Sequence, residues 1–281
     1  MKVKKFTIIV HAIAWATALI WIIPFLGVFM ASIRPYAEVQ FGWWNFQSFH
    51  PTLENFYDAW IGKTAGSSAA LNTGLVHSLI VTVPATFIPV FVAALAAYSF
   101  ARFSFRTKDL LFLVLVLLQT IPQQMVILPV YNLMKSLGLL NSYVGLILLH
   151  TAFGLPWQIL FLRNFFSTLP IEVEEAARVD GASYFKIFYK IILPMSLPAL
   201  ASILSLQFVW VWNDFFFALT LIQNPNMRLA TQTIPVIKGR YEPNWSVLSA
   251  ASIIAMIVPI AIYVALQRYY VRGITAGAVK G

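Results

Sequence analysis

The residues best suited to bind a polar organic ligand gather near the end of the fifth apolar stretch, at Trp210, Trp212, Asn213 and Asp214. Aromatic faces stack on the apolar faces of sugar rings, whereas amide and carboxylate groups pair with hydroxyls. Asp214 is the only acidic residue inside an apolar stretch, and ionisable groups are costly in a membrane, which favours a functional role. The alternative is an aromatic belt at the membrane surface with a helix-capping acid. The sequence leaves both readings open.

Other reactive side chains predict no catalytic site. The histidines have no metal-ligand spacing and are expected to be structural; they are His11, His50, His77 and His150. There are no cysteines, which excludes disulfides and thiol catalysis. A glycine-rich phosphate loop with Lys and Ser or Thr is absent, so we expect any ATP hydrolysis to occur on another subunit. An integral membrane enzyme would need converging His, Asp and Glu residues inside the apolar stretches, and the sequence offers none.

The composition is that of a membrane protein. Of the 281 residues, 60% are hydrophobic and 10% are charged, against roughly 25% charged in soluble domains. Continuous apolar intervals, each long enough to cross a bilayer, indicate an all-α protein with six transmembrane helices rather than a barrel. The intervals are Phe6 to Ile33, Thr64 to Ala101, Leu110 to Met134, Ser136 to Leu162, Ile191 to Met227 and Pro243 to Gln267.

Lysine and arginine set the predicted orientation. With a cytoplasmic N-terminus, thirteen of the 19 basic residues fall in cytoplasmic segments and six in outer loops. The positive-inside bias therefore predicts that both termini are cytoplasmic. The net charge of +9 follows from this topology and is spread over short loops, which argues against nucleic-acid binding. The first apolar run, Phe6 to Met30, is too long for a cleaved signal and is read as a first membrane helix.

Two outer loops could contact a partner or ligand. Residues 32–72 are aromatic and predict either a small external lobe or docking surface, or simple anchoring at the membrane interface. The loop from Gln223 to Trp245 is long enough to fold back toward a pore. In it, Tyr241 and Trp245 are candidates for contact with a ligand or its carrier.

One segment inside this apolar chain is unusually charged. Val173 to Pro194 carries six charges, at Glu174, Glu175, Arg178, Asp180, Lys186 and Lys190. A first helix is predicted by Ser167 or Thr168 as its cap, by Pro170 and by early acidic residues, and Gly181 ends it. Ser183 caps a second helix, in which Phe185, Phe188 and Ile192 are expected to share one face. The sequence thus predicts a helix, a tight turn and an amphipathic helix that enters the membrane at Pro194.

This segment resembles the EAA loop of ABC importer permeases. The matching pattern is Glu175-Ala176-Ala177, three residues, Gly181, nine residues, Ile191, one residue and Leu193-Pro194. In that family the loop forms a coupling helix that docks on the cytoplasmic ATPase. The resemblance implies this role for a segment at 167–194, with Glu174, Glu175, Ala176, Ala177, Asp180, Gly181, Leu193 and Pro194. The alternative is an amphipathic loop that lies on the lipid surface.

Two more motifs resemble the carbohydrate importers within that family. Trp212-Asn213-Asp214 is similar to a feature of sugar permeases, and the tail from Gly273 to Gly281 is similar to that of maltose-type MalG subunits. The second resemblance implies a tail at 268–281 that inserts between ATPase subunits, with Gly273, Thr275, Gly277 and Lys280 as contacts. Three glycines and the lack of an apolar period argue against a free-standing helix there, which suits an extended insert or a frayed end equally.

Taken together, the resemblance implies a type I (MetI-like) ABC importer permease fold. Its parts would be residues 1–31, the outer loop 32–72, a permease core at 73–267 and the tail 268–281. The chain would form half of a sugar pathway in a prokaryotic cell membrane. Its partners would be a second, MalF-like permease, two ATPase subunits that hold ATP and Mg²⁺, an extracytoplasmic sugar-binding protein and the lipid bilayer, and it would bind no cofactor itself.

A different class of transporter is the main alternative. An ion-coupled secondary sugar transporter would work alone, but it would favour more buried acids and paired broken helices than this sequence has.

Overall fold

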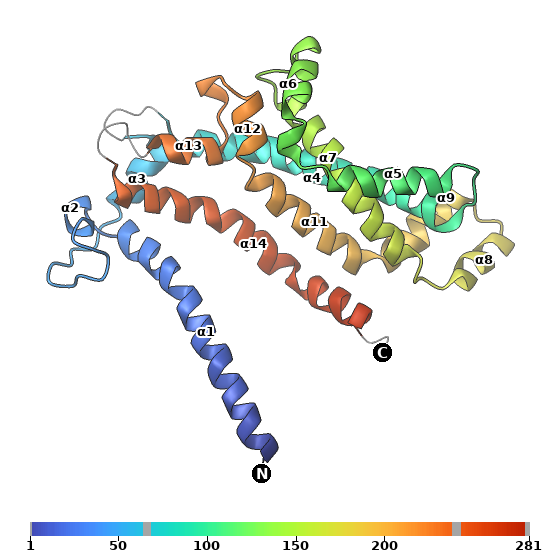
Figure 1. Cartoon of the computed structure of the whole chain (residues 1–281), viewed down its shortest axis with the longest axis horizontal. Helices are drawn as coiled ribbons and strands as arrows, with labels where there is room; N and C mark the ends of the chain where they lie inside the picture. The colour runs from blue at the N-terminus through green and yellow to red at the C-terminus, as the bar shows by residue number, and fades with distance from the viewer. Residues whose placement is uncertain (1, 64–68, 238–242, 279–281) are drawn as a thin grey trace. The chain divides into compact units, whose positions relative to one another are not determined.

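The computed structural model describes residues 2–63, 69–237 and 243–278, and it describes side chains between residues 7 and 268 outside those gaps. All regular secondary structure in these ranges is helical (Figure 1). The chain forms two compact units. One comprises residues 1–75 and 232–257, and the other comprises residues 76–231 and 258–281.

Within the described residues, four helices are long and apolar enough to cross a membrane. They are α1 (Lys2–Ser32), α4 (Leu71–Arg102), α7 (Tyr143–Phe166) and α14 (Trp245–Ala278). A fifth span exists if one bent helix pair, Tyr184–Met195 with Leu197–Trp212, is counted as a single crossing.

The remaining predicted span, Leu110 to Met134, is not one helix. It is divided into α5 (Lys108–Thr120), a short 3₁₀ turn η1 (Gln123–Met125) and α6 (Ile127–Ser136). The break falls at Ile121, whose backbone is extended because it precedes Pro122. The apolar composition predicted a crossing here, but the proline divides the segment into two short helices.

Helix α7 is the centre of the second unit, and α5, α11 and α12 pack on it (Figure 1). One buried apolar cluster surrounds its C-terminal half and includes Ala97, Leu162, Phe166 and Phe188. Another surrounds its N-terminal half and includes Leu146 and Phe217. The helix therefore has a buried face in both of its halves, and each half belongs to a separate core.

The segment after α7 folds as a bent series of helices. It comprises α8 (Ile171–Val179), α9 (Tyr184–Ile187), a π-helical turn η2 (Phe188–Ile192), α10 (Leu193–Met195) and α11 (Leu197–Trp212). The axis bends by 77° between the part ending at Met195 and α11. Pro198 lies in the first turn of α11, where a missing N–H is tolerated. After α11 come α12 (Phe216–Leu221) and η3 (Pro225–Met227).

Two details of this segment differ from the sequence prediction. Pro170 is itself the N-cap of α8, and Ser167 is instead the C-cap of α7. Phe185 does not share the buried face of Phe188 and Ile192, because its side chain is 70% exposed. The π turn instead adds Ile187 to this face, because its wider five-residue step aligns Ile187 with Ile192, and both are buried.

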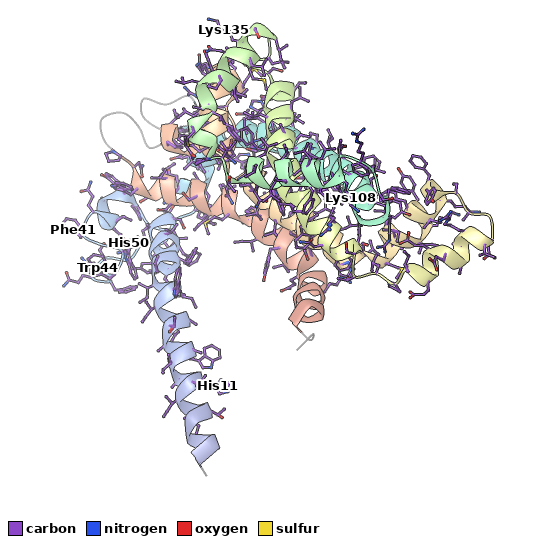
Figure 2. The ribbon with its side chains drawn as sticks, turned by 45° about the vertical axis from the view of Figure 1, so that its right-hand side comes forward. His11, Phe41, Trp44, His50, Lys108 and Lys135 are labelled. Carbon is purple, nitrogen blue, oxygen red and sulfur yellow. The ribbon has the colours of Figure 1, made fainter. Side chains whose placement is uncertain are left out.

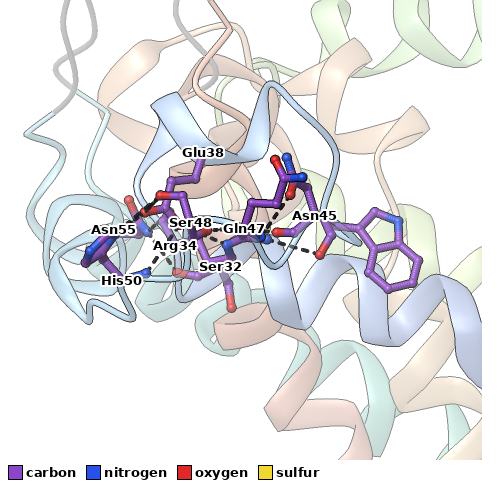
Figure 3. Close-up of polar contacts among 9 residues, drawn as sticks. Ser32, Arg34, Glu38, Asn45, Gln47, Ser48, His50 and Asn55 are labelled. Atoms are coloured by element: carbon purple, nitrogen blue, oxygen red, sulfur yellow. Dashed lines mark hydrogen bonds and ion pairs between the residues drawn. The ribbon is translucent and has the colours of Figure 1, made fainter.

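In the first unit, a polar cluster organises the segment that follows α1. This segment contains α2 (Tyr36–Val39) and α3 (Glu54–Ile61), and the unit also includes most of α13 (Ala230–Ile237). Arg34 is 1% exposed and donates to the carbonyl oxygens of Trp43, Asn45 and Ser48 (Figure 3). The buried Arg34 guanidinium thus holds this short aromatic lobe together by hydrogen bonds to its backbone.

Glu38 completes this cluster. It accepts hydrogen bonds from Arg34 at 3.1 Å and from the hydroxyl of Ser48 at 3.1 Å, and it contacts the ring Nδ1 of His50 at 2.7 Å (Figure 3). The hydrogen bond with the His50 side chain, aided by Arg34, lowers the pKa of Glu38 to about 2. The lobe also carries exposed aromatic side chains, among them Phe41 and Trp44 (Figure 2). It is thus folded by polar contacts while its aromatic surface stays open.

Candidate functional site

The predicted coupling segment forms a sharp elbow between α8 and α9. Gly181 makes the turn with φ of 80°, a left-handed conformation that side chains disfavour. The N–H of Ala182 donates to the carbonyl of Ala177 at 2.9 Å, which closes the end of α8. On the other side, the hydroxyl of Ser183 accepts from the N–H of Lys186 at 3.4 Å and begins α9. The predicted turn at Gly181 and the predicted cap at Ser183 are both present.

Glu174 anchors this elbow to the end of α4. Its carboxylate accepts hydrogen bonds from the Nε of Arg102 at 2.6 Å and from the hydroxyl of Tyr98 at 2.9 Å. Both charged side chains are at least nine-tenths buried. Arg102 also donates to the carbonyl of Leu169 at 3.1 Å, just before α8. A buried charge pair of this kind fixes position, because separating it would leave a charge without a partner.

The other motif residues of the elbow divide by exposure. Glu175, Ala176, Asp180 and Gly181 are exposed, so they form an accessible surface at the tip. Glu174 was predicted to belong to this contact surface, but it is 5% exposed and faces α4. The sequence motif could not separate the two neighbouring acids. Of the motif's distal pair, Leu193 is half-buried and Pro194 is exposed in α10, away from the turn.

Between the two arms of the elbow is a small hollow of about 210 Å³ that the lysines Lys186 and Lys190 line together with Asp180. The arms are also bridged by a cation–π contact, in which the Arg178 guanidinium lies 4.9 Å from the Tyr184 ring centre. The tip therefore combines one rigid turn with a charged, accessible edge.

A larger cavity lies beside α11 in the second unit. Its volume is about 950 Å³, and its lining includes Ser205, Trp210, Asn213, Asp214 and Tyr263. Two aromatic rings, a hydroxyl, an amide and a carboxylate are the groups that hold a sugar by ring stacking and hydroxyl pairing. The predicted mixture of residues is thus present in one cavity.

The cavity corrects one predicted contact. Trp212 is 3% exposed and stacks on Phe208 with ring centres 5.8 Å apart, so it packs inside the unit and does not line the cavity. The ring that does so is Trp210, two positions earlier on α11. Tyr263 on α14 was not predicted at all, since it lies far away in the sequence and has no local motif.

Asp214 has a structural role that the sequence had proposed as one of two alternatives. Its two carboxylate oxygens accept the backbone N–H groups of Phe217 at 3.1 Å and Ala218 at 3.0 Å, so it caps α12. The Nε2 of His150 lies 3.5 Å from the same carboxylate, and the His150 ring meets Trp210 edge to face. Asp214 therefore both satisfies N–H groups in the first turn of α12 and forms part of the cavity wall.

The loop after α12 is held by side chains from several elements. The amide oxygen of Asn141 accepts the N–H groups of Gln223 at 2.7 Å and Asn224 at 2.8 Å. His77 contacts the carbonyl of Arg228 at 3.0 Å, a structural role like the one expected for it. Among the described residues, no group of three or more His, Asp or Glu side chains is placed to hold a metal ion.

The remaining predicted contacts lie elsewhere or are not described. Tyr241 and Lys280 lie outside the described residues, and Trp245 begins α14 and is about half exposed. The backbone from Gly273 to Ala278 continues α14 as a helix, so the prediction of a non-helical tail is wrong over that range. These residues extend an existing helix and so need no new nucleation step. That advantage outweighs the low helix propensity of Gly273 and Gly277.

Comparison with known proteins now identifies the family. The model for binding-protein-dependent transport system inner membrane components matches residues 89–276, which include the elbow, α11 and most of α14. The chain belongs to this family. It is therefore a component of a membrane transport system that works with a binding protein.

Three relatives in this family are similar over most of the chain. A Pyrococcus horikoshii protein named a probable ABC transporter permease is 48% identical over 100% of both chains. The osmoprotective compounds uptake permease protein GgtD of Synechocystis is 41% identical over 96% of this chain and 91% of its own. The alpha-glucoside transport system permease protein AglG of Rhizobium meliloti is 42% identical over 82% of this chain and 60% of its own. All three are named as transport permeases, and none supports the ion-coupled alternative.

A solved structure shares the fold of this transport component. It is a chain from a bacterial ABC transporter that imports the acidic polysaccharide alginate, with a TM-score of 0.76 and 21% identity. The match covers 95% of this chain and 97% of the other. The predicted type I importer permease fold is thus confirmed as an all-helical arrangement.

Proposed function

We propose that this family member is one permease subunit of an ATP-driven sugar importer and forms half of the translocation pathway. The observation that carries the proposal is the division of two adjacent acids at the elbow. Glu174 is locked to α4 by Arg102, whereas Glu175 faces outward beside Ala176. A segment built this way can pass a movement of a bound partner to α4, because its tip is accessible to the partner and its base is fixed to that membrane helix.

The partner at this tip is a separate ATPase subunit. The chain has no phosphate-binding loop, so the energy for transport comes from outside it. ATP and Mg²⁺ bind in two such ATPase subunits, and a second, MalF-like permease completes the pathway. The exposed small residue Ala176 permits close approach of the ATPase surface, and Glu175 and Asp180 supply charge for pairing. Both termini and the elbow lie on the cytoplasmic side, in agreement with the basic residues of those segments.

The cargo class is a sugar. Trp210 and Tyr263 provide faces for ring stacking, and Asn213 and Ser205 provide hydrogen-bonding groups in a cavity of about 950 Å³. That volume is at the upper end of the range typical of small-molecule sites. One of the similar permeases is named for alpha-glucoside transport, which agrees with this chemistry. An extracytoplasmic binding protein delivers the sugar to the cavity.

Transport then follows from a shift between two arrangements of the helices. ATP-driven closure of the ATPase pair brings the elbows of the two permeases together and opens the pathway outward. Hydrolysis releases the elbows and reopens the pathway inward. Each state is populated according to the differential binding of nucleotide and of the loaded binding protein.

The elbow can be tested with a pair of matched glycine variants. Gly181 and Gly138 both have positive φ, at 80° and 68°, and a Cβ added at either meets no atom within 4 Å. Replacing either by Val costs roughly 1–2 kcal/mol of backbone strain, without a steric clash. Only Gly181 lies in the coupling segment, so Gly181→Val should abolish uptake and weaken ATPase co-purification while Gly138→Val retains both. Equal ATPase retention and uptake in the two variants would refute the proposal.

A further inference from the structure

A buried polar contact links α4 and α11 at the centre of the second unit. The Nε2 of Gln207 on α11 donates to the backbone carbonyl of Ala85 on α4 at 3.0 Å. The side chain of Gln207 and the residue Ala85 are both fully buried. A side chain that bonds a helix carbonyl normally competes with the helix's own N–H four residues later. At this position, there is no such competitor.

The residue four positions after Ala85 is Pro89, inside α4. Proline has no N–H, so it leaves the carbonyl of Ala85 without its intrahelical donor. In a membrane interior an unpaired carbonyl is costly, and a side chain from a neighbouring helix is one group that can satisfy it. The Gln207 amide occupies the place of the missing N–H.

The third helix at this point is α7, which contributes Gly154 and Gln158. A Cβ placed on Gly154 would lie 3.0 Å from the Nε2 of Gln158 and 3.0 Å from the Nε2 of Gln207. Both carboxamides therefore rest against the same glycine. Among the described residues, neither polar atom of Gln158 has a hydrogen-bond partner, and the Oε1 of Gln207 has none. Such unused hydrogen-bonding groups in a buried site are exceptional and need a reason.

We propose that Gln207 is a positioning residue for transport: it replaces the hydrogen bond lost at Pro89 and thereby ties α4 to α11. The Gln158 amide is its second partner, which pairs with Gln207 when α4 moves at the proline in the other state of the transport cycle. Gly154 leaves the room that this exchange needs. The transport part rests on the proposed function, whereas the hydrogen bond itself does not.

Restoring the missing donor tests the first part. Gln207→Leu should shorten the half-life of thermal inactivation of the purified complex about threefold or more, the range expected for a buried interhelical hydrogen bond. In a Pro89→Ala background, the new N–H of residue 89 satisfies Ala85, so Gln207→Leu should have little effect on that half-life. Pro84→Ala is the matched control, because it lies in the same helix but its new N–H pairs with the carbonyl of Ile80 and leaves that of Ala85 without a donor. An equal effect of Gln207→Leu in all three backgrounds would overturn the assignment.

Uptake in proteoliposomes tests the positioning role. The Pro89→Ala/Gln207→Leu variant keeps the Ala85 carbonyl paired but lacks the link between α4 and α11, so it should transport less sugar per ATP hydrolysed than the unaltered complex. Gln158→Leu should also reduce transport without shortening the inactivation half-life. If either variant transports as much sugar per ATP hydrolysed as the unaltered complex, the corresponding part of the proposal is wrong. If the half-lives behave as expected but no sugar is carried even by the unaltered complex, the failure lies in the proposed function and not in the hydrogen bond.

Discussion

Replacing Glu174 should lower the stability of the elbow, whereas replacing Glu175 should weaken ATPase binding, although the two acids are adjacent in the same motif. Glu174 shares a buried pair with Arg102, in which the two side chains are 7% and 9% exposed. Glu174→Leu leaves the guanidinium buried without a counter-charge and the Tyr98 hydroxyl without its acceptor. Breaking one partner of a buried pair costs about 3 kcal/mol or more. Glu175 is exposed, and replacing it should change stability by less than about 0.5 kcal/mol.

A cost of about 3 kcal/mol corresponds to a change of roughly 150-fold in the equilibrium between the anchored and the released elbow. Because the chain has no cysteine, a single thiol can report it. Ala199→Cys, at a position that is 2% exposed, reacts with a fluorescent maleimide only when the unit opens. Glu174→Leu should lower the temperature at which this thiol reacts. Glu175→Leu should leave that temperature unchanged but weaken ATPase co-purification.

A double substitution supplies the control. Arg102→Met with Glu174→Leu replaces the pair by apolar groups of similar size, and such replacements are often neutral in stability. The double variant should therefore react at a temperature closer to that of the parent than either single variant does. If Glu174→Leu and Glu175→Leu react at the same temperature, the anchor has no energetic role and the reasoning fails.

Three further predictions concern other parts of the chain. Trp210→Ala should raise the sugar concentration for half-maximal uptake by up to about tenfold through lost stacking, whereas Trp212→Phe should not; equal effects would remove Trp210 from the cavity's function. Since the pKa of Glu38 falls from 4.5 to about 2 in the folded lobe, its contribution to stability is complete above about pH 4.5 and is lost toward pH 2. Tryptophan fluorescence of the lobe should follow that window, and His50→Ala should shift it to higher pH; an unshifted transition would contradict the role of His50. Asn141 has φ of 51° and accepts two N–H groups. Asn141→Gly should therefore lower stability, and Asn141→Ala should lower it further, by about 2 kcal/mol relative to Asn. Thermal inactivation measures this order, and any other order would contradict the role of Asn141.

The sequence predicted those features that depend on local chemistry. Gly181 had to adopt a left-handed turn because it follows a helix and precedes a capping serine, and this turn is present. Asp214 precedes an aromatic helix, and its capping role was one of the alternatives that the sequence left open. Each of these features is decided by a few neighbouring residues.

Features that depend on pairing between distant segments were not predicted. Glu174 and Glu175 have the same chemistry, and only the arrival of Arg102 from α4 makes one a buried anchor. Trp210 and Trp212 are equally aromatic, and their places depend on which side of α11 faces Phe208. The break at Pro122 shows a further limit, because a hydropathy interval records composition and not the continuity of the backbone.

The second unit contains three separate ties between α4 and the segment that holds the elbow. At one end, Arg102 and Tyr98 hold Glu174 in α8. Further along, Gln207 in α11 holds the carbonyl that Pro89 leaves free. Between them, Phe188 and Ile192 of the π turn pack in the same buried cluster as Ala93 and Ala97 of α4. A rigid elbow that moved relative to α4 would have to break the charge pair and this packing together, at a cost well above that of one interhelical hydrogen bond. The weakest of the three ties is the bond at Pro89, so a displacement of the elbow should carry the adjoining end of α4 with it and be absorbed by a change at the proline.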